Sequence, residues 1–300
     1  TGQNIVALSP NTLADKYFRF NGATDDWDFY NGTMVPGVGY IIRTPKEGNP
    51  WPNGEIVSFP YSQPVAFKGV PNNGDYSFSA GAGEFNLIGN PYPSAIDADS
   101  FMTNTNNASI INGALYFWTH NTVITNNEYT ADDYASYTLT GGTGTGGVGN
   151  FVDANNNGIM DPVEEVVSNR PLGKIAAGQS FFVENAAAGS FQFTNAMRAT
   201  GNNSQFFKQA NTKKTATVEK NRVWLNLTNS GGAFKQLLVG YITGATNDWD
   251  NMYDGPTFDG QEFVDFYSVN QGKNLTIQGR ALPFVDTDVV PLGYRSTIAG

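Results

Sequence analysis

Tyr76-Ser77-Phe78-Ser79 alternates aromatic with polar side chains, and Phe191-Gln192-Phe193-Thr194 alternates in the same way. Successive side chains of a β-strand point to opposite faces of a sheet, so each stretch predicts a strand with one buried and one solvated face. Short runs of this kind, bounded by Gly, Pro or Asn, recur along the chain. In its first part the predicted strands are 16–20, 39–43, 55–59, 64–69, 75–79, 85–89, 114–119, 136–140, 180–184 and 190–193.

The pattern breaks at residues 205–221, which are polar and without a period, and then resumes. We expect a linker at 208–220; its four lysines leave a basic patch as the alternative. Later strands are predicted at 222–228, 236–242, 263–269 and 274–278. The sequence therefore predicts an all-β chain with a β domain at 1–207, which we expect to hold two related β units. A second β-sandwich at 221–300 is expected to continue beyond the given chain.

Composition supports β-sandwich or jelly-roll-like domains with short helices and long Gly/Asn-rich loops. Apolar residues form 40% of the 300 residues, but charged residues only 15%, which disfavours long surface helices. One short helix is predicted over Asp97–Met102, because acidic residues favour a helix start. The net charge of −10 makes nucleic acid an unfavourable partner. No apolar run has the length of a membrane-spanning helix.

Residues 152–165 read VDANNNGIMDPVEE and space oxygen-bearing side chains regularly. A calcium loop of the EF-hand type presents ligands at positions one, three, five, seven, nine and twelve, with Gly at position six. Gly158 falls at position six. The ligands in a loop over 153–164 would be Asp153, Asn155, Asn157, Ile159 through its carbonyl, Asp161 and Glu164. We expect Ca²⁺ here as a structural cross-link, with an Asn/Asp-rich turn without metal as the alternative.

Two pairs of segments resemble each other within the chain. Residues 22–28 (GATDDWD) resemble 244–250 (GATNDWD), and residues 36–42 (PGVGYII) resemble 177–183 (AGQSFFV). The second pair suggests related β units in the first domain. The first pair is open to coincidence, because short Asp/Trp turns recur by chance.

The stretch 85–97 (FNLIGNPYPSAID) is the most distinctive of the sequence. With 116–119, 177–183 and Met197-Arg198, it resembles a region of large secreted and surface proteins of Bacteroidota. That region precedes the C-terminal sorting domain read by the type IX secretion system. Segments of the second domain resemble the β-sandwich that follows it, namely 245–250, 253–255, 266–268, 275–279 and 290–294. The resemblance implies an extracellular or outer cell-surface location, with secretion machinery and cell-surface components as partners; it implies no catalytic residue.

Candidate sites outside the calcium loop carry weaker signals. The single histidine, His120, follows a predicted aromatic strand, and the sequence contains no GxSxG motif. A catalytic triad is therefore not expected. Acidic turn residues could hold a second cation: Asp248, Asp250, Asp254 and Asp259. Trp side chains in polar turns could stack on sugar rings: Trp27, Trp51 and Trp249. The alternative is that each Trp covers the edge of a core.

These observations favour a non-catalytic, calcium-stabilised segment of a large exported protein, with a structural or adhesion role. The alternative is a carbohydrate-binding accessory module of a secreted polysaccharide-degrading enzyme. A glycoside hydrolase is a further alternative, and it requires two carboxylates at a defined separation.

Overall fold

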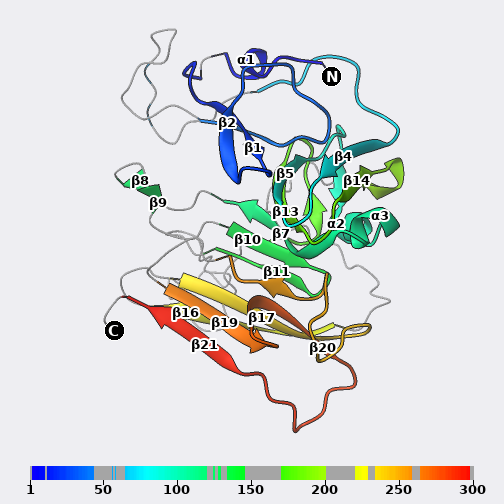
Figure 1. The fold of residues 1–300 in the computed structure, drawn as a ribbon, viewed down its shortest axis with the longest axis vertical. Helices are drawn as coiled ribbons and strands as arrows, with labels where there is room; N and C mark the ends of the chain where they lie inside the picture. The colour runs from blue at the N-terminus through cyan, green and yellow to red at the C-terminus, as the bar shows by residue number, and fades with distance from the viewer. Residues whose placement is uncertain are drawn as a thin grey trace, which may run out of the picture. The chain divides into compact units, whose positions relative to one another are not determined.

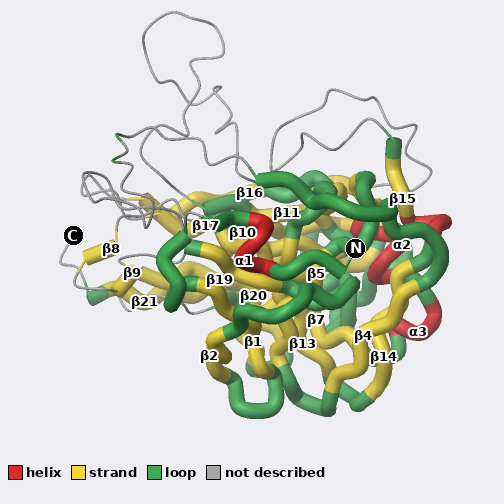
Figure 2. The backbone as a smooth tube through the Cα atoms, turned by 90° about the horizontal axis from the view of Figure 1, so that it is seen from above, coloured by secondary structure: helices red, strands yellow, loops and turns green. Residues whose placement is uncertain are grey.

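The computed structural model describes residues 2–10, 12–43, 56, 58, 65–119, 124–125, 128–129, 134–145, 170–200, 220–228, 234–258 and 264–297. Strands dominate this part of the chain, with only short helical segments among them (Figure 2). The prediction of an all-β, sandwich-like chain is therefore confirmed.

The chain divides into two compact units whose bounds differ from the predicted ones. The first comprises residues 1–110 and 175–203, and the second comprises 111–174 and 204–300. The described residues between 111 and 145 belong with the second unit because they bond to its later strands and loops. Leu139 N donates to Met252 O at 2.8 Å, and Thr140 Oγ1 donates to Tyr253 O at 2.7 Å. Strand patterns do not reveal such long-range partners, so the interleaving could not be read from the sequence.

The first unit contains several small sheets and short helices (Figure 1). Its elements are α1 (Ile5–Leu8), β1 (Tyr17–Asn21), β2 (Asp26–Phe29), β3 (Tyr40–Ile42), β4 (Tyr76–Ala80), β5 (Phe85–Gly89), β6 (Ala95–Asp97), α2 (Ala98–Met102), α3 (Thr105–Ala108), β12 (Lys174–Ile175, at the boundary), β13 (Ser180–Asn185), β14 (Gly189–Phe193), the 3-10 turn η1 (Asn195–Met197) and β15 (Arg198–Ala199). The two alternating stretches that predict strands pair with each other, since β4 and β14 are antiparallel with Phe78 opposite Phe191. The predicted strand 64–69 is irregular over its described residues, where the Gln3 side chain bonds Ala66 O and Lys68 N.

The second internal similarity corresponds to the same local structure at both places. Gly37 and Gly178 each occupy a turn with φ of 87° and 72°, which a residue without Cβ adopts freely. Each turn leads into a strand, β3 or β13. Both segments bond to β5: β13 pairs with it in antiparallel register, and Gly39 N donates to Leu87 O at 2.9 Å. Two related turn-and-strand segments thus bond to one strand.

Aromatic rings fill the core of the first unit. The Phe101 ring centre lies 5.4 Å from that of Phe181, 6.1 Å from that of Phe191 and 5.1 Å from that of Phe193. All four side chains are buried. Phe101 belongs to α2, which begins as predicted: Asp97 caps it by accepting from Ser100 N at 2.8 Å.

The distinctive stretch 85–97 stabilises this unit. The buried Asn90 side chain accepts from Tyr92 N at 3.0 Å and donates to Ser94 O, Ile175 O and Ala176 O at 2.8–3.2 Å. Tyr92 donates to Gly74 O at 2.7 Å. The Arg198 guanidinium carbon lies 5.5 Å from the centre of the Tyr92 ring. The side chains of Asn90 and Tyr92 thus satisfy backbone groups of this unit, and this structural role accounts for Asn and Tyr at these two positions.

The second unit is organised around a large sheet with the order β16-β17-β20-β19-β21 and β18 paired to β20 (Figure 1). Its strands are β7 (Ile111–Trp118), β8 (Ile124–Thr125), β9 (Glu128–Tyr129), β10 (Tyr134–Thr138), β11 (Gly141–Thr143), β16 (Lys220–Thr228), β17 (Phe234–Ile242), β18 (Gly255–Pro256), β19 (Val264–Asn270), β20 (Lys273–Ala281) and β21 (Leu292–Ser296). β10 pairs with both β7 and β11. Trp224 of β16 donates from its indole to Gly142 O at 3.0 Å, with the Arg170 guanidinium carbon 4.2 Å from its ring centre.

Candidate binding face on the β1–β3 sheet

The three-stranded sheet β2-β1-β3 separates its side chains into an apolar and a polar face. β1 pairs with β2 through Phe18 opposite Phe29 and Phe20 opposite Trp27, so these four side chains share one face. Arg19 lies opposite Asp28 on β2 and opposite Tyr40 on β3, which places the three on the other face. We call the second one the polar face; it comprises Arg19, Asn21, Asp26, Asp28, Tyr30 and Tyr40.

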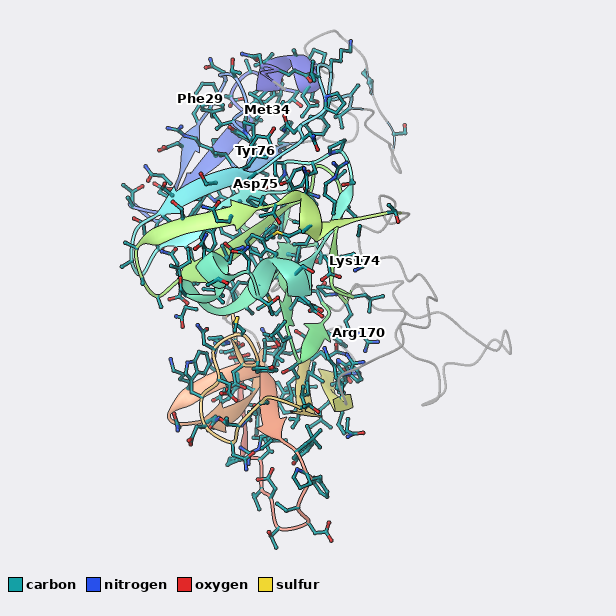
Figure 3. All side chains as sticks on the ribbon, turned by 90° about the vertical axis from the view of Figure 1, so that its right-hand side faces the viewer. Phe29, Met34, Asp75, Tyr76, Arg170 and Lys174 are labelled. Atoms are coloured by element: carbon teal, nitrogen blue, oxygen red, sulfur yellow. The ribbon has the colours of Figure 1, made fainter. Side chains whose placement is uncertain are left out.

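Part of the apolar face, Phe20 and Trp27, packs on the core of the first unit, whereas Phe29 is 52% exposed. The Phe20 ring centre lies 4.9 Å from that of Phe182 on β13, and the Trp27 ring centre lies 6.0 Å from it. Phe29, labelled in Figure 3, meets Phe18 edge to face. Trp27 is 37% exposed, and its ring also meets Phe20 at 5.3 Å. Trp27 therefore lies at an edge of this core with part of its side chain exposed, and a sugar-stacking role for it stays a prediction.

The charged groups of the polar face form a half-exposed cluster. Arg19 Nη2 lies 3.5 Å from Asp28 Oδ2, and the same oxygen accepts from Asn21 Nδ2 at 3.3 Å. The Arg19 side chain is 48% exposed and that of Asp28 is 38% exposed. An exposed pair of this kind contributes little to stability, between about 0 and 1 kcal/mol. Its donors and acceptors are, however, held together and accessible to a ligand.

Two tyrosine rings adjoin this cluster. The Tyr30 and Tyr40 ring centres lie 5.3 Å apart with an interplanar angle of 33°, and the Arg19 guanidinium carbon lies 5.1 Å from the centre of the Tyr30 ring. Tyr30 donates to Thr33 O, and Tyr40 accepts from Val35 N at 2.9 Å. Burial raises the pKa of Tyr40. Both phenols are therefore anchored to the backbone.

Gly32 lets the Tyr30 ring lie against the backbone. A Cβ at residue 32 would stand 2.9 Å from two atoms of that side chain, its ring carbon Cζ and its hydroxyl oxygen. Any larger residue would push the ring away from its place beside Arg19. One end of the polar face is covered, because Tyr17 is buried and donates to Ser9 O and Thr12 O near α1. The residues that define the polar face are exposed or half-buried.

The other candidate tryptophans have different settings. Trp249 lies in the second unit, partly buried, with Lys273 Nζ 4.4 Å from the centre of its ring. One side of that ring is thus covered by an ammonium group. Trp51 lies outside the described residues, and so does His120.

Three of the acidic residues predicted to hold a second cation accept hydrogen bonds from other groups of the protein. Asp254 is fully buried; Oδ1 accepts from Gly279 N at 2.7 Å and Oδ2 from Asp250 N at 2.9 Å. Asp250 accepts from Thr246 N, and Asp248 accepts from Gln271 Nε2 at 2.8 Å. Desolvation raises the pKa of Asp254 to about 6. Asp259 is not among the described residues, and those that are described hold no group of three or more metal-binding side chains.

Two buried ion pairs also belong to the second unit. Arg280 and Asp288 are paired, and Tyr241 donates to Asp288 Oδ2 at 2.9 Å. Lys235 Nζ lies 3.7 Å from Asp265 Oδ1, which also accepts from Thr257 Oγ1 at 2.9 Å. Every oxygen and nitrogen named here has a partner within the protein, so these groups hold strands and loops together. The calcium loop at 153–164 lies outside the described residues and stays a prediction.

The geometry of the described residues thus leaves the polar face as the best candidate site. A family model matches residues 1–300, and its description is "Domain of unknown function (DUF8693)". The chain belongs to the DUF8693 family. Neither the search of curated proteins nor that of solved structures gave a match. Within its described part, this DUF8693 chain has no helix of the length and apolar character needed to cross a membrane.

Proposed function

We propose that this chain is a non-catalytic adhesion segment of an exported surface or secreted protein, and that the polar face of the β1–β3 sheet holds a polysaccharide. The observation that carries the proposal is the exposed Arg19–Asp28 pair beside the Tyr30 and Tyr40 rings. Sugars present hydroxyl groups at their edges and C–H groups on their faces. Paired donors and acceptors next to aromatic rings match both features.

The extracellular setting rests on the resemblance of stretch 85–97 and its companions to type IX secretion substrates of Bacteroidota. The second unit fits a supporting role, because its buried charged groups bond to strands and loops rather than to a common point. Ca²⁺ at Asp153–Glu164 would add a cross-link in this account. An accessory module beside a catalytic domain would use the same face, so both forms of the proposal share one test.

The test is retardation of the purified chain in native gels cast with polysaccharides, with calcium and with chelator. Tyr30→Ala should weaken retardation about tenfold, because losing contact with roughly 55 Å² of ring surface corresponds to about 1.4 kcal/mol. Tyr294→Ala is the matched control, since Tyr294 is 71% exposed on β21 in the other unit. Retardation that is unaffected by Tyr30→Ala would place binding elsewhere. No retardation by any polymer would favour a spacer without glycan binding, and release of reducing sugar would contradict the non-catalytic role.

A further inference from the structure

The polar face carries more negative than positive charge among the described residues. Arg19 is its one cation among the described residues, and Asp28 offsets that charge at 3.5 Å. Asp26 also belongs to this face and is exposed, with Oδ1 accepting from Trp27 N at 2.7 Å. Asp25 is exposed in the turn just before it, at φ 52°. Among the described residues, Asp25 and Asp26 therefore have no cationic partner, and both lie beside the cluster.

We infer that the polar face is selective for neutral polysaccharides and rejects those carrying carboxylate or sulfate groups; this inference rests on the proposed function. Carboxylates of the polymer would meet Asp25 and Asp26, whose repulsion Arg19 offsets only in part because Asp28 already shares its charge. Uncharged hydroxyls meet no such barrier. They can accept from Arg19 and Asn21 and donate to Asp28, while Tyr30 and Tyr40 contact the ring face of a sugar.

The expected selectivity follows from Coulomb's law. At low salt, one polymer charge about 8 Å from one carboxylate in water costs about a twofold loss in affinity. Two carboxylates give about fourfold, and neighbouring charges within the Debye length add to this. The preference should shrink as salt is raised.

Matched polymers test the inference: hydroxyethylcellulose against carboxymethylcellulose, and dextran against dextran sulfate, by retardation in native gels at low and high salt. We expect at least fourfold weaker retardation by the charged member of each pair that binds. In Asp25→Asn/Asp26→Asn the difference should fall toward twofold or less. Asn keeps the side-chain acceptor for Trp27 N and tolerates the positive φ of residue 25.

Each outcome has a separate meaning. Charged polymers that bind as tightly as neutral ones, or a double variant with unchanged preference, would overturn the inference while the proposed function stood. Retardation by no polymer would remove the proposed function and the inference together. Asp15→Asn/Asp99→Asn is the control for net charge alone, because both residues are exposed or half-exposed in the same unit but off the polar face. A control that changed the preference as much as Asp25→Asn/Asp26→Asn would show that total charge, and not this face, sets the selectivity.

Discussion

Acidification from pH 7 to pH 5 should stabilise the second unit through Asp254. This carboxyl group is 0% exposed and accepts two backbone N–H bonds, from Gly279 at 2.7 Å and from Asp250 at 2.9 Å. Desolvation penalises the charged form, and the two donors offset only part of that penalty. The pKa of Asp254 therefore rises from 3.8 to about 6.

The sign and size of the effect follow from that rise. A carboxyl group whose pKa is higher in the folded state binds its proton more tightly there, so protonation favours folding. This contribution is complete below pH 3.8 and is lost as the pH rises through about 6. Its limit is about 3 kcal/mol, from roughly two units at 1.36 kcal/mol each. Between pH 7 and pH 5 the free energy of unfolding should rise by about 1 kcal/mol.

Urea unfolding at several pH values, with hydrogen exchange over 246–256 as a local reading, measures this change. Asp254→Asn should show a flat profile over the same range, because an amide does not titrate there. It should also be less stable than the parent at pH 5 by about 1–3 kcal/mol, since the amide can accept only one of the two N–H bonds. The chain carries a net charge of −10, so acidification also relieves general repulsion. Asp248→Asn, at an exposed carboxyl in the same loop, controls for that term.

The reasoning would be refuted by a parent protein whose stability falls or stays level between pH 7 and pH 5. Equal pH slopes in the parent and in Asp254→Asn would refute it as well. The pH range of the urea measurements stops at pH 5 because a second carboxyl group, Asp288, contributes to the pH dependence at lower pH. Asp288 has a pKa held below its usual value by Arg280, so its contribution is present above pH 3.8 and is lost as the pH falls through its lowered pKa.

Four further outcomes are expected. Asp288→Asn should lower the free energy of unfolding by about 3 kcal/mol, because it leaves the buried Arg280 without its counter-charge; urea unfolding at pH 7 measures this. Gly113→Ala should destabilise by about 2–4 kcal/mol in the same assay, since φ is +85° and a Cβ would lie 2.7 Å from Pro256, whereas Gly272→Ala at φ +77° meets nothing within 4 Å and should cost about 1 kcal/mol. Gly32→Ala should weaken polysaccharide retardation as Tyr30→Ala does, while leaving the melting temperature nearly unchanged. Calcium should raise the melting temperature of the parent, and Asp153→Asn/Glu164→Gln should remove that increase.

Local patterns predicted most strands but few of their partners. The stretch 85–89 is a strand at the predicted bounds, and Asp97 caps the predicted helix. β2 was missed because its sequence, Asp26-Trp27-Asp28-Phe29, has the acidic composition of a turn. It becomes a strand through its pairing with β1, which brings the Trp27 and Phe29 rings into contact with Phe20 and Phe18. Composition alone does not report such a tertiary contribution.

The candidate site was missed for a related reason. The registers of two strand pairs bring Tyr30, Tyr40 and Arg19 together, and the sequence does not specify those registers. A signal was present: Phe18 and Phe20 alternate with Arg19 and Asn21, and Trp27 and Phe29 alternate with Asp28 and Tyr30. Reading both runs as one hairpin would have separated an apolar from a polar face. The sequence instead predicts Trp27 as a sugar contact, and Trp27 belongs to the apolar face.

The two similar heptads show how context decides what an acidic side chain can bind. In 22–28 the chain turns and then pairs with β1, so Asp26 and Asp28 project from a sheet face toward solvent or Arg19. In 244–250 the chain stays irregular, Asp250 accepts from Thr246 N, and Asn247 accepts from Ala281 N at 3.0 Å. The backbone groups that a strand would satisfy by pairing are satisfied there by side chains. Asp250 is therefore engaged in holding a loop, whereas Asp26 in the first segment is exposed.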